Sequence, residues 1–206
     1  MKAAGLITVA GQSLRMLTFK PLLPINGRPM IAHTAGVFSE AGITSLYVVV
    51  GKRGEEIISA LEGYKAHFLW NNAFEETEMF ASLQIGLNAI HRAGGFDAAF
   101  LLPGDMPAVA PEVLHQLMRE MEAGGWDVVF PSTGKHRLHP PLIHQRLFDA
   151  LIAYPGEDGL RGAFRTLEAR IGYVVTQEAG CRLDVDTPED YERVQQYMKK
   201  NPEDEA

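Results

Sequence analysis

The sequence has little cysteine and no long hydrophobic run. Cys181 is the single cysteine among 206 residues. One thiol can form neither an intrachain disulfide nor a thiolate metal cluster, so the chain fits a reducing compartment and Cys181 is expected to be a small core residue. No apolar stretch approaches the roughly 18 residues that a membrane-spanning helix needs, and no signal-peptide pattern precedes the first apolar run. These absences predict a cytoplasmic protein without a membrane partner.

The sequence also lacks an excess of positive charge. Its formal net charge is −7, which argues against broad nucleic-acid binding because that function needs a basic face. A local pair of cations could still hold a nucleoside triphosphate. The hydrophobic content of 46% is ordinary for a globular protein with a sizeable core, and the length favours one domain. We expect this domain over residues 1–198, followed by a frayed C-terminal tail over 199–206.

Neither common glycine-rich nucleotide fingerprint is present. G-x-G-x-x-G fails because no glycine lies between Gly11 and Gly27, and the P-loop pattern fails because position 16 is methionine. The loop after the apolar run 3–9 nevertheless contains Arg15 and Lys20, with small residues before them and two prolines after. Small residues allow close backbone approach to a ligand, and cations attract phosphate oxygens. From chemistry alone, the loop is either a phosphate site or a solvated surface loop.

Apolar runs and helical periodicity alternate along the chain. This alternation predicts an α/β fold with a parallel, doubly wound sheet. Strands are expected within 3–9, 46–50, 68–70, 98–102, 127–130 and 171–175, with helical segments between them. The segment 181–186 alternates like a further strand, which would place Asp184 and Asp186 on one face. Thr187 then predicts a helix N-cap, with Asp190 as its capping-box partner.

Two aspartates follow apolar segments at positions that suit metal binding. Asp105 lies in Pro103–Pro107, directly after a buried strand, and such carboxylates at the carboxyl edge of a sheet suit Mg²⁺. Its alternative role is to cap the next helix. Asp184 and Asp186 would repel each other on one strand face unless a cation lies near.

A basic segment rich in histidine runs from Lys135 to His139. No cysteine is near it and no acidic residue lies at ligand spacing, so zinc is not expected. The segment either faces a ligand-binding cleft, where its positive charge would suit a phosphorylated acceptor, or forms a solvated hairpin.

Together these stretches resemble the MobA-like nucleotidyltransferases, most closely the molybdenum cofactor cytidylyltransferases. The first loop resembles A-A-G-x-S-x-R-M-G-x-x-K-x-L-L-P, and later stretches resemble G-M-x-x-S-L-x-x-G-L, G-D-M-P, G-H-P and D-x-D-T-P-E-D-Y. Residues in register with these motifs include Ala10, Gly11, Ser13, Arg15, Met16, Lys20, Met79, Ser82, Asp105, His139 and Asp186. The sequence departs from the pattern at Val9, Leu17, Glu78 and Leu138. At position 17 a glycine would allow positive φ or a close approach to the terminal phosphates, whereas leucine at positive φ is costly.

The resemblance implies a Rossmann-like three-layer fold with a mostly parallel, mixed central sheet. It also implies roles for individual residues. Arg15, Lys20 and Asp105 would be catalytic, and Asp105 and Asp186 would hold Mg²⁺. Nucleotide-binding residues would be Val9, Ala10, Gly11, Ser13, Arg15, Lys20, Met79 and Ser82. His139 and Arg161 would bind the acceptor.

The implied activity is transfer of a nucleoside monophosphate with release of pyrophosphate. In the family, alanine before the glycine goes with cytidine, so Ala10 favours CTP over GTP. The implied acceptor is a molybdopterin-type cofactor, and a molybdoenzyme is a possible recipient of the product. Two alternatives remain open. One is transfer to a sugar or alcohol phosphate; the other is a non-catalytic chaperone that binds the molybdenum cofactor.

Overall fold

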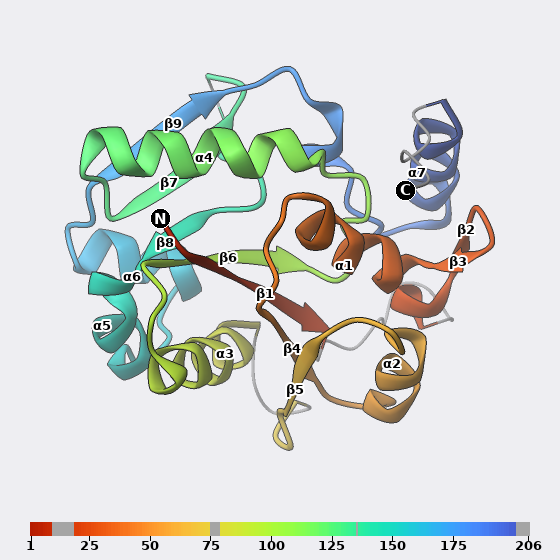
Figure 1. Cartoon of the computed structure of the whole chain (residues 1–206), viewed down its shortest axis with the longest axis horizontal. Helices are drawn as coiled ribbons and strands as arrows, with labels where there is room; N and C mark the ends of the chain where they lie inside the picture. The colour runs from red at the N-terminus through yellow and green to blue at the C-terminus, as the bar shows by residue number, and fades with distance from the viewer. Residues whose placement is uncertain (10–18, 75–78, 135, 201–206) are drawn as a thin grey trace.

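A seven-stranded mixed sheet forms the centre of the computed structural model, which describes residues 1–9, 19–74, 79–134 and 136–200. The strand order is β5-β4-β1-β6-β8-β7-β9 (Figure 1). The strands are β1 (Ala3–Val9), β4 (Leu46–Val50), β5 (Ala66–Trp70), β6 (Ala98–Pro103), β7 (Val128–Ser132), β8 (Leu142–His144) and β9 (Ile171–Val175). β1 pairs in parallel with both β4 and β6, and so lies at the middle of the parallel half.

β8 is the one antiparallel strand of this sheet among the described residues. It pairs with β6 through Phe100↔Leu142 and with β7 through Val129↔Leu142. Leu142 and Ile143 point into the two opposite apolar cores, so both faces of this short strand are buried. Three residues are too few for a strand period to be recognised, which explains why the sequence pattern does not single β8 out. The mostly parallel, mixed sheet that the family resemblance implies is confirmed.

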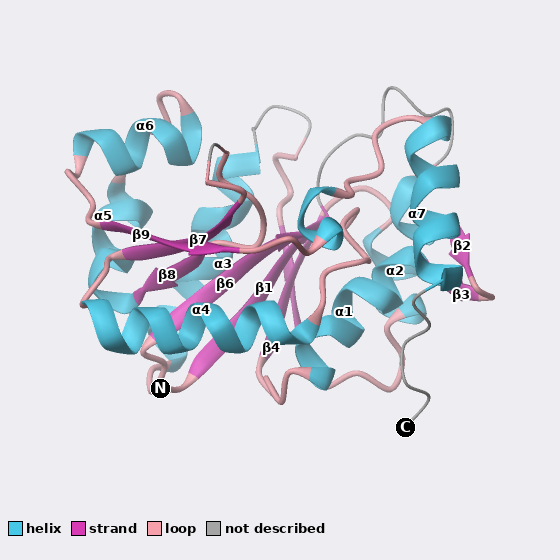
Figure 2. Cartoon of the chain, turned by 90° about the horizontal axis from the view of Figure 1, so that it is seen from above, coloured by secondary structure: helices cyan, strands magenta, loops and turns pink. Residues whose placement is uncertain are grey.

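Helices cover both faces of the sheet (Figure 2). One apolar core lies beneath α1 (Met30–Glu40), α2 (Gly54–Ala60) and α4 (Pro111–Gly124). The other lies beneath α3 (Met79–Ala93), α5 (Phe148–Ala153) and α6 (Gly159–Thr166). This arrangement confirms the three-layer expectation. Cys181 is buried in the first core as expected, and burial raises the pKa of its thiol to about 12.

A smaller third core holds α7 (Pro188–Lys200) against a two-stranded ribbon. The ribbon consists of β2 (Pro24–Ile25) and β3 (Arg28–Pro29), and Ile25 packs with Val194 and Met198. The Tyr191 hydroxyl and the Gln195 side-chain amide both donate hydrogen bonds to the Pro24 carbonyl. This packing joins the C-terminal helix to the chain just after η1 (Lys20–Leu22), a 3₁₀ turn.

The strand expected within 181–186 is wrong. The chain forms a 3₁₀ turn, η3 (Ala179–Arg182), and then an extended segment outside both sheets. Gly180 passes so close to the Ala108 backbone that a Cβ would lie 1.7 Å from that carbonyl oxygen. The side chains still alternate, since Val185 is buried and Asp184 is exposed, and a hydrogen bond from Val185 N to Asp105 O, 3.1 Å, ties the segment to the turn after β6.

The predicted helix start at Thr187 is confirmed. The Asp190 backbone N–H donates to Thr187 Oγ1 at 3.2 Å, and Asp190 Oδ2 accepts from the Thr187 N–H at 2.8 Å. These reciprocal bonds are those of a capping box.

Among the helices of the described residues, none combines the length and the apolar composition that a membrane span requires.

Candidate functional site

The turn that carries Asp105 crosses the end of β1. Gly104 N donates to Thr8 O at 3.1 Å, and a Cβ on Gly104 would lie 2.0 Å from a methyl carbon of Val9. Only a residue without a side chain lets the turn pass this close to β1. The turn therefore places Asp105 at the carboxyl edge of the parallel strands, beside the end of β1.

The loop before α7 brings Asp186 to the same edge. Val185 N bonds to Asp105 O, which links the two loops directly. Asp190 Oδ2 accepts from the Asp186 backbone N–H at 3.1 Å, so the capping box also fixes the backbone of Asp186. In Figure 1, the carboxyl ends of β1 and β6 point toward the side of the molecule where α7 lies.

Lys20 joins the two aspartates. Its ammonium Nζ donates to Asp186 Oδ1 at 2.8 Å and lies 3.3 Å from Asp105 Oδ2. The lysine side chain is only 12% exposed, against 25% for Asp105 and 42% for Asp186. Three of the residues that the sequence assigns to catalysis or metal binding thus meet within one cluster, although they come from three separate parts of the chain.

The electrostatics of this cluster reflect burial more than pairing at Asp105. Burial raises the pKa of Asp105 more than the Lys20 charge and hydrogen bond lower it, and the nearby charge of Asp184 raises the pKa further. For Lys20 the balance is reversed. Burial lowers the pKa of its ammonium, but the hydrogen bond to Asp186 and the charge of Asp105 raise it overall. Lys20 is therefore a firmly charged cation held between two carboxylates.

The two carboxylates also form a donor set that fits a hard divalent cation. Within the described ranges, no group of three or more His, Cys, Asp and Glu side chains could hold a metal ion. A cation here would rely on Asp105 and Asp186 together with water and substrate phosphates. Mg²⁺ is usually bound in this way, through one or two carboxylates and the phosphates of a nucleotide. The convergence of both carboxylates on one ammonium supports the fit, because it shows that the pair already holds a positive charge.

Two buried polar atoms at this edge have no hydrogen-bond partner in the described part of the chain. They are Thr8 Oγ1 and His139 Nδ1. Leaving such a group unpaired costs about 1–3 kcal/mol, so each is a candidate to contact a ligand. Burial lowers the pKa of His139, although the negative charge of Asp184 raises it, so the imidazole is neutral at neutral pH. Thr8 was not a sequence candidate; the signal available was a polar residue within the apolar run 3–9.

The first turn of α3 places the two expected nucleotide contacts differently. Met79 is 53% exposed, whereas Ser82 is buried. Ser82 Oγ accepts from Asn71 Nδ2 at 3.1 Å, and Asn71 Oδ1 accepts from Ala73 N at 3.1 Å. Asn71 N in turn donates to Val50 O at 2.8 Å. Asn71 therefore anchors α3 to the ends of β4 and β5, a role that its position as the first residue after a strand did not reveal.

The remaining candidates lie apart from the carboxylates or outside the described residues. Arg161 is exposed on α6, and no described hydrogen bond joins it to the cluster of Lys20, Asp105 and Asp186. Val9 is buried at the end of β1, in register with Val50. Leu138, at a glycine position of the family pattern, packs in the first core. The candidates outside the described residues are Ala10, Gly11, Ser13 and Arg15, together with the departures Leu17 and Glu78.

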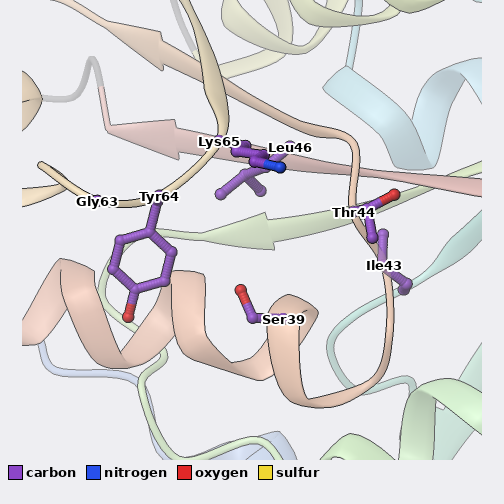
Figure 3. A pocket seen from close by; sticks show the side chains of 7 residues that line it. All are labelled: Ser39, Ile43, Thr44, Leu46, Gly63, Tyr64 and Lys65. Atoms are coloured by element: carbon purple, nitrogen blue, oxygen red, sulfur yellow. The ribbon is translucent and has the colours of Figure 1, made fainter.

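A surface hollow lies at the opposite, amino edge of the sheet (Figure 3). It has a volume of about 350 Å³ and is lined by Ser39, Ile43, Thr44, Leu46, Gly63, Tyr64 and Lys65. Leu46 begins β4, whereas Asp105 follows the end of β6, so the hollow and the carboxylate cluster are separated by the length of the sheet. No carboxylate or histidine is among the residues that line the hollow, whereas the carboxyl edge brings Lys20, Asp105 and Asp186 together.

Known proteins resemble the chain over most of its length. A probable molybdenum cofactor guanylyltransferase from Natranaerobius thermophilus is 26% identical over 217 residues, covering 96% of this chain and 97% of that protein. The bifunctional protein GlmU from Thermus thermophilus is 32% identical over 124 residues, or 59% of this chain. The chain spans about a quarter of the length of GlmU, since the match covers 26% of it.

Solved structures share the fold at lower identity. A nucleotidyl transferase from Methanothermobacter thermautotroptrophicus superposes with a TM-score of 0.81 at 23% identity, covering 97% of this chain and 98% of that one. A Mycobacterium tuberculosis protein, Rv0371C in complex with manganese, gives a TM-score of 0.74 at 22% identity, covering 95% and 99%. The model of the MobA-like NTP transferase domain matches residues 5–171. The chain belongs to the MobA-like NTP transferase family.

Proposed function

We propose that this nucleotidyltransferase moves CMP from CTP to the phosphate of a molybdopterin-type cofactor and releases pyrophosphate. The observation that carries the proposal is the meeting of Lys20, Asp105 and Asp186 at the carboxyl edge of the sheet. This edge is where open α/β sheets bind their ligands. Lys20 can neutralise phosphate charge directly, and the two carboxylates can do so through a bound metal ion. The cluster therefore suits a triphosphate better than an uncharged substrate.

The reaction needs positioning and charge neutralisation more than covalent catalysis. An oxygen of the acceptor phosphate forms a bond to the α-phosphorus of the triphosphate. The bond from that phosphorus to the oxygen bridging to the β-phosphate breaks, and its electron pair leaves with pyrophosphate. Negative charge therefore builds on the leaving group, where a positive side chain stabilises the transition state.

Each residue of the cluster has a role in this scheme. Lys20 donates to phosphate oxygens of the triphosphate, with Arg15 of the preceding loop as a second cation. Asp105 and Asp186 would hold Mg²⁺, which supplies charge neutralisation at the phosphates when bound. The backbone of Val9, Ala10 and Gly11 would read the base, and alanine at position 10 favours cytosine.

Other residues would bind the acceptor. His139 Nδ1 is buried without a described partner and is available to a polar group of the acceptor. Arg161 on α6 is the second acceptor candidate, and Ser13, Met79 and Ser82 complete the nucleotide side. The likeness to a molybdenum cofactor guanylyltransferase along nearly the whole chain supports a molybdopterin-type acceptor. A molybdoenzyme would then receive the product.

Pyrophosphate release tests the proposal directly. The full chain is incubated with Mg²⁺, either CTP or GTP, and either molybdopterin or a sugar phosphate. We expect release with CTP and molybdopterin, and loss of release in Asp105→Ala with an unchanged circular dichroism spectrum. Release with GTP alone would correct the nucleotide, and release with the sugar phosphate alone would correct the acceptor. Cofactor binding without release from either triphosphate would favour a non-catalytic chaperone.

A further inference from the structure

Lys20 occupies the position between the two carboxylates that a divalent cation would need. Nζ lies 2.8 Å from Asp186 Oδ1 and 3.3 Å from Asp105 Oδ2. Two carboxylates this close to one another repel unless a positive charge separates them. The lysine supplies that charge from within the chain. A second cation bound to the same two oxygens would lie against the ammonium, and the two positive charges would repel strongly in a partly buried site.

The backbone around Lys20 is fixed, whereas its side chain can move. Leu23 N donates to Lys20 O at 2.9 Å, and Pro21 in the same 3₁₀ turn is buried. The ammonium itself stands at the end of a flexible four-carbon stem. Lys20 can therefore exchange one set of anionic oxygens for another without unfolding the turn. Phosphate oxygens of a triphosphate at this edge would offer such a set.

We propose that Lys20 is an internal counter-ion that closes the Asp105–Asp186 pair to divalent cations until a nucleoside triphosphate draws its ammonium away. The proposal rests on the proposed function, since it takes the triphosphate to be the ligand of this edge. Nucleotidyl transfer alone does not require a link between metal binding and nucleotide binding, but a counter-ion that must be displaced creates one. Metal binding and nucleotide binding are coupled, and by linkage each tightens the other to the same extent. The protein without nucleotide binds the metal weakly, which prevents a bare metal site from forming.

Charge and geometry support this exchange over a permanent ion pair. Asp186 is 42% exposed and Asp105 25%, so the pair faces the solvent from which a cation would arrive. The lysine side chain, at 12%, is less exposed than either carboxylate. The capping box holds Asp186 and the turn after β6 holds Asp105 without help from Lys20. The backbone that positions each carboxylate therefore stays in place when the ammonium leaves.

The test is Mn²⁺ binding by the full chain, measured from the electron paramagnetic resonance signal of free Mn²⁺. In the absence of nucleotide, Lys20→Met is expected to bind Mn²⁺ about tenfold or more tightly than the wild type, within the range usual for coupled sites. CTP or GTP is expected to tighten Mn²⁺ binding by the wild type but to add little in Lys20→Met. Lys20→Arg keeps the positive charge and should bind Mn²⁺ as weakly as the wild type.

Lys65→Met is the matched control. It removes the same charge from an exposed lysine in the hollow at the other edge of the sheet (Figure 3) and should leave Mn²⁺ affinity unchanged. If Lys20→Met unfolds, Lys20→Gln replaces it, with circular dichroism as the check. Equal Mn²⁺ affinity in the wild type and the neutral Lys20 variants would overturn the proposal, as would equal tightening in Lys65→Met. If the wild type releases pyrophosphate but binds Mn²⁺ with the same affinity as Lys20→Met, only the counter-ion proposal is refuted. Tighter Mn²⁺ binding by Lys20→Met, with no pyrophosphate release by the wild type from either triphosphate, would refute the transfer reaction alone.

Discussion

Asp105 and Asp127 lie at opposite edges of the same sheet, and the protein shifts their pKa values in opposite directions. Asp105 follows the end of β6, whereas Asp127 directly precedes β7, which runs parallel to β6. The Asp127 side chain is the less exposed, 14% against 25%. Burial would raise the pKa of both, but at Asp127 the Arg170 backbone N–H and the charges of Arg146 and Arg170 lower it overall. At Asp105 burial wins and the pKa is raised.

The difference distinguishes a carboxylate that the protein pairs internally from one that we propose to be functional. Asp127 accepts from Arg170 N at 2.7 Å and pairs with two guanidinium groups, so its charge is satisfied within the protein. Asp105 has one ammonium at 3.3 Å and lies in a cluster open to solvent. A carboxylate with a raised pKa at the carboxyl edge of a sheet is the one expected to meet a ligand. Conservative substitutions of both residues test this contrast.

The largest expected effect is on catalysis by Asp105→Asn. We expect kcat for pyrophosphate release to fall about 10²–10³-fold or more, by analogy with the loss of one transition-state contact. The amide keeps the shape of the side chain but loses the negative charge that would attract Mg²⁺ in the proposed site. Asp127→Asn, the matched substitution at the other edge, should leave kcat unchanged. Equal losses in the two variants would show that Asp105 acts through the fold rather than at the reacting phosphates.

Stability should respond in the opposite order. Asp127→Asn loses two ion pairs in a poorly exposed position, and we expect the free energy of unfolding to fall by about 1–3 kcal/mol. For a chain of this length, that corresponds to about 2–4 °C in Tm per kcal/mol. Asp105→Asn should keep or increase the stability, because its carboxylate is disfavoured by burial. Asp149→Asn serves as control, since Asp149 is 84% exposed in its pair with His91 and such surface pairs contribute little. Thermal unfolding of the three variants would decide.

A smaller effect is expected where the carboxyl edge is held by neutral groups. Ser82→Ala leaves the Asn71 amide without the hydroxyl acceptor that it has at 3.1 Å, and both side chains are buried. We expect a loss of about 1 kcal/mol in unfolding free energy. Because Met79 lies in the same first turn, KM for the nucleotide should rise more than kcat falls. Ser59→Ala on the exposed side of α2 is the control. A rise in KM without any loss of stability would mean that Ser82 contacts the nucleotide itself.

The sequence predicts much of this edge but not how its charges pair. Apolar runs locate β1 and β6, and the residues that follow them place Asp105 correctly at the carboxyl edge. The ion pairs of Lys20 cannot be read from the sequence, because Asp105 and Asp186 lie 85 and 166 residues away from it along the chain. Periodicity also predicts a strand at residues 181–186, and this prediction is wrong. The side chains of an extended segment outside the sheet, fixed by the close approach of Gly180 to Ala108, alternate between buried and exposed as those of a strand do.

The smallest effect is the dependence of stability on pH, and it should have opposite signs at the two aspartates. A lowered pKa in the folded state gives stability that is present above the unfolded value, about 3.9 for aspartate, and is lost as pH falls through the folded value. The advantage of the wild type over Asp127→Asn should therefore shrink below about pH 4. A raised pKa gives stability that is present below the unfolded value and lost as pH rises through the folded one. Asp105→Asn should therefore gain on the wild type as pH rises from about 4 toward neutral. Denaturant unfolding at several pH values measures both differences, and two curves of the same sign would contradict the contrast between the edges.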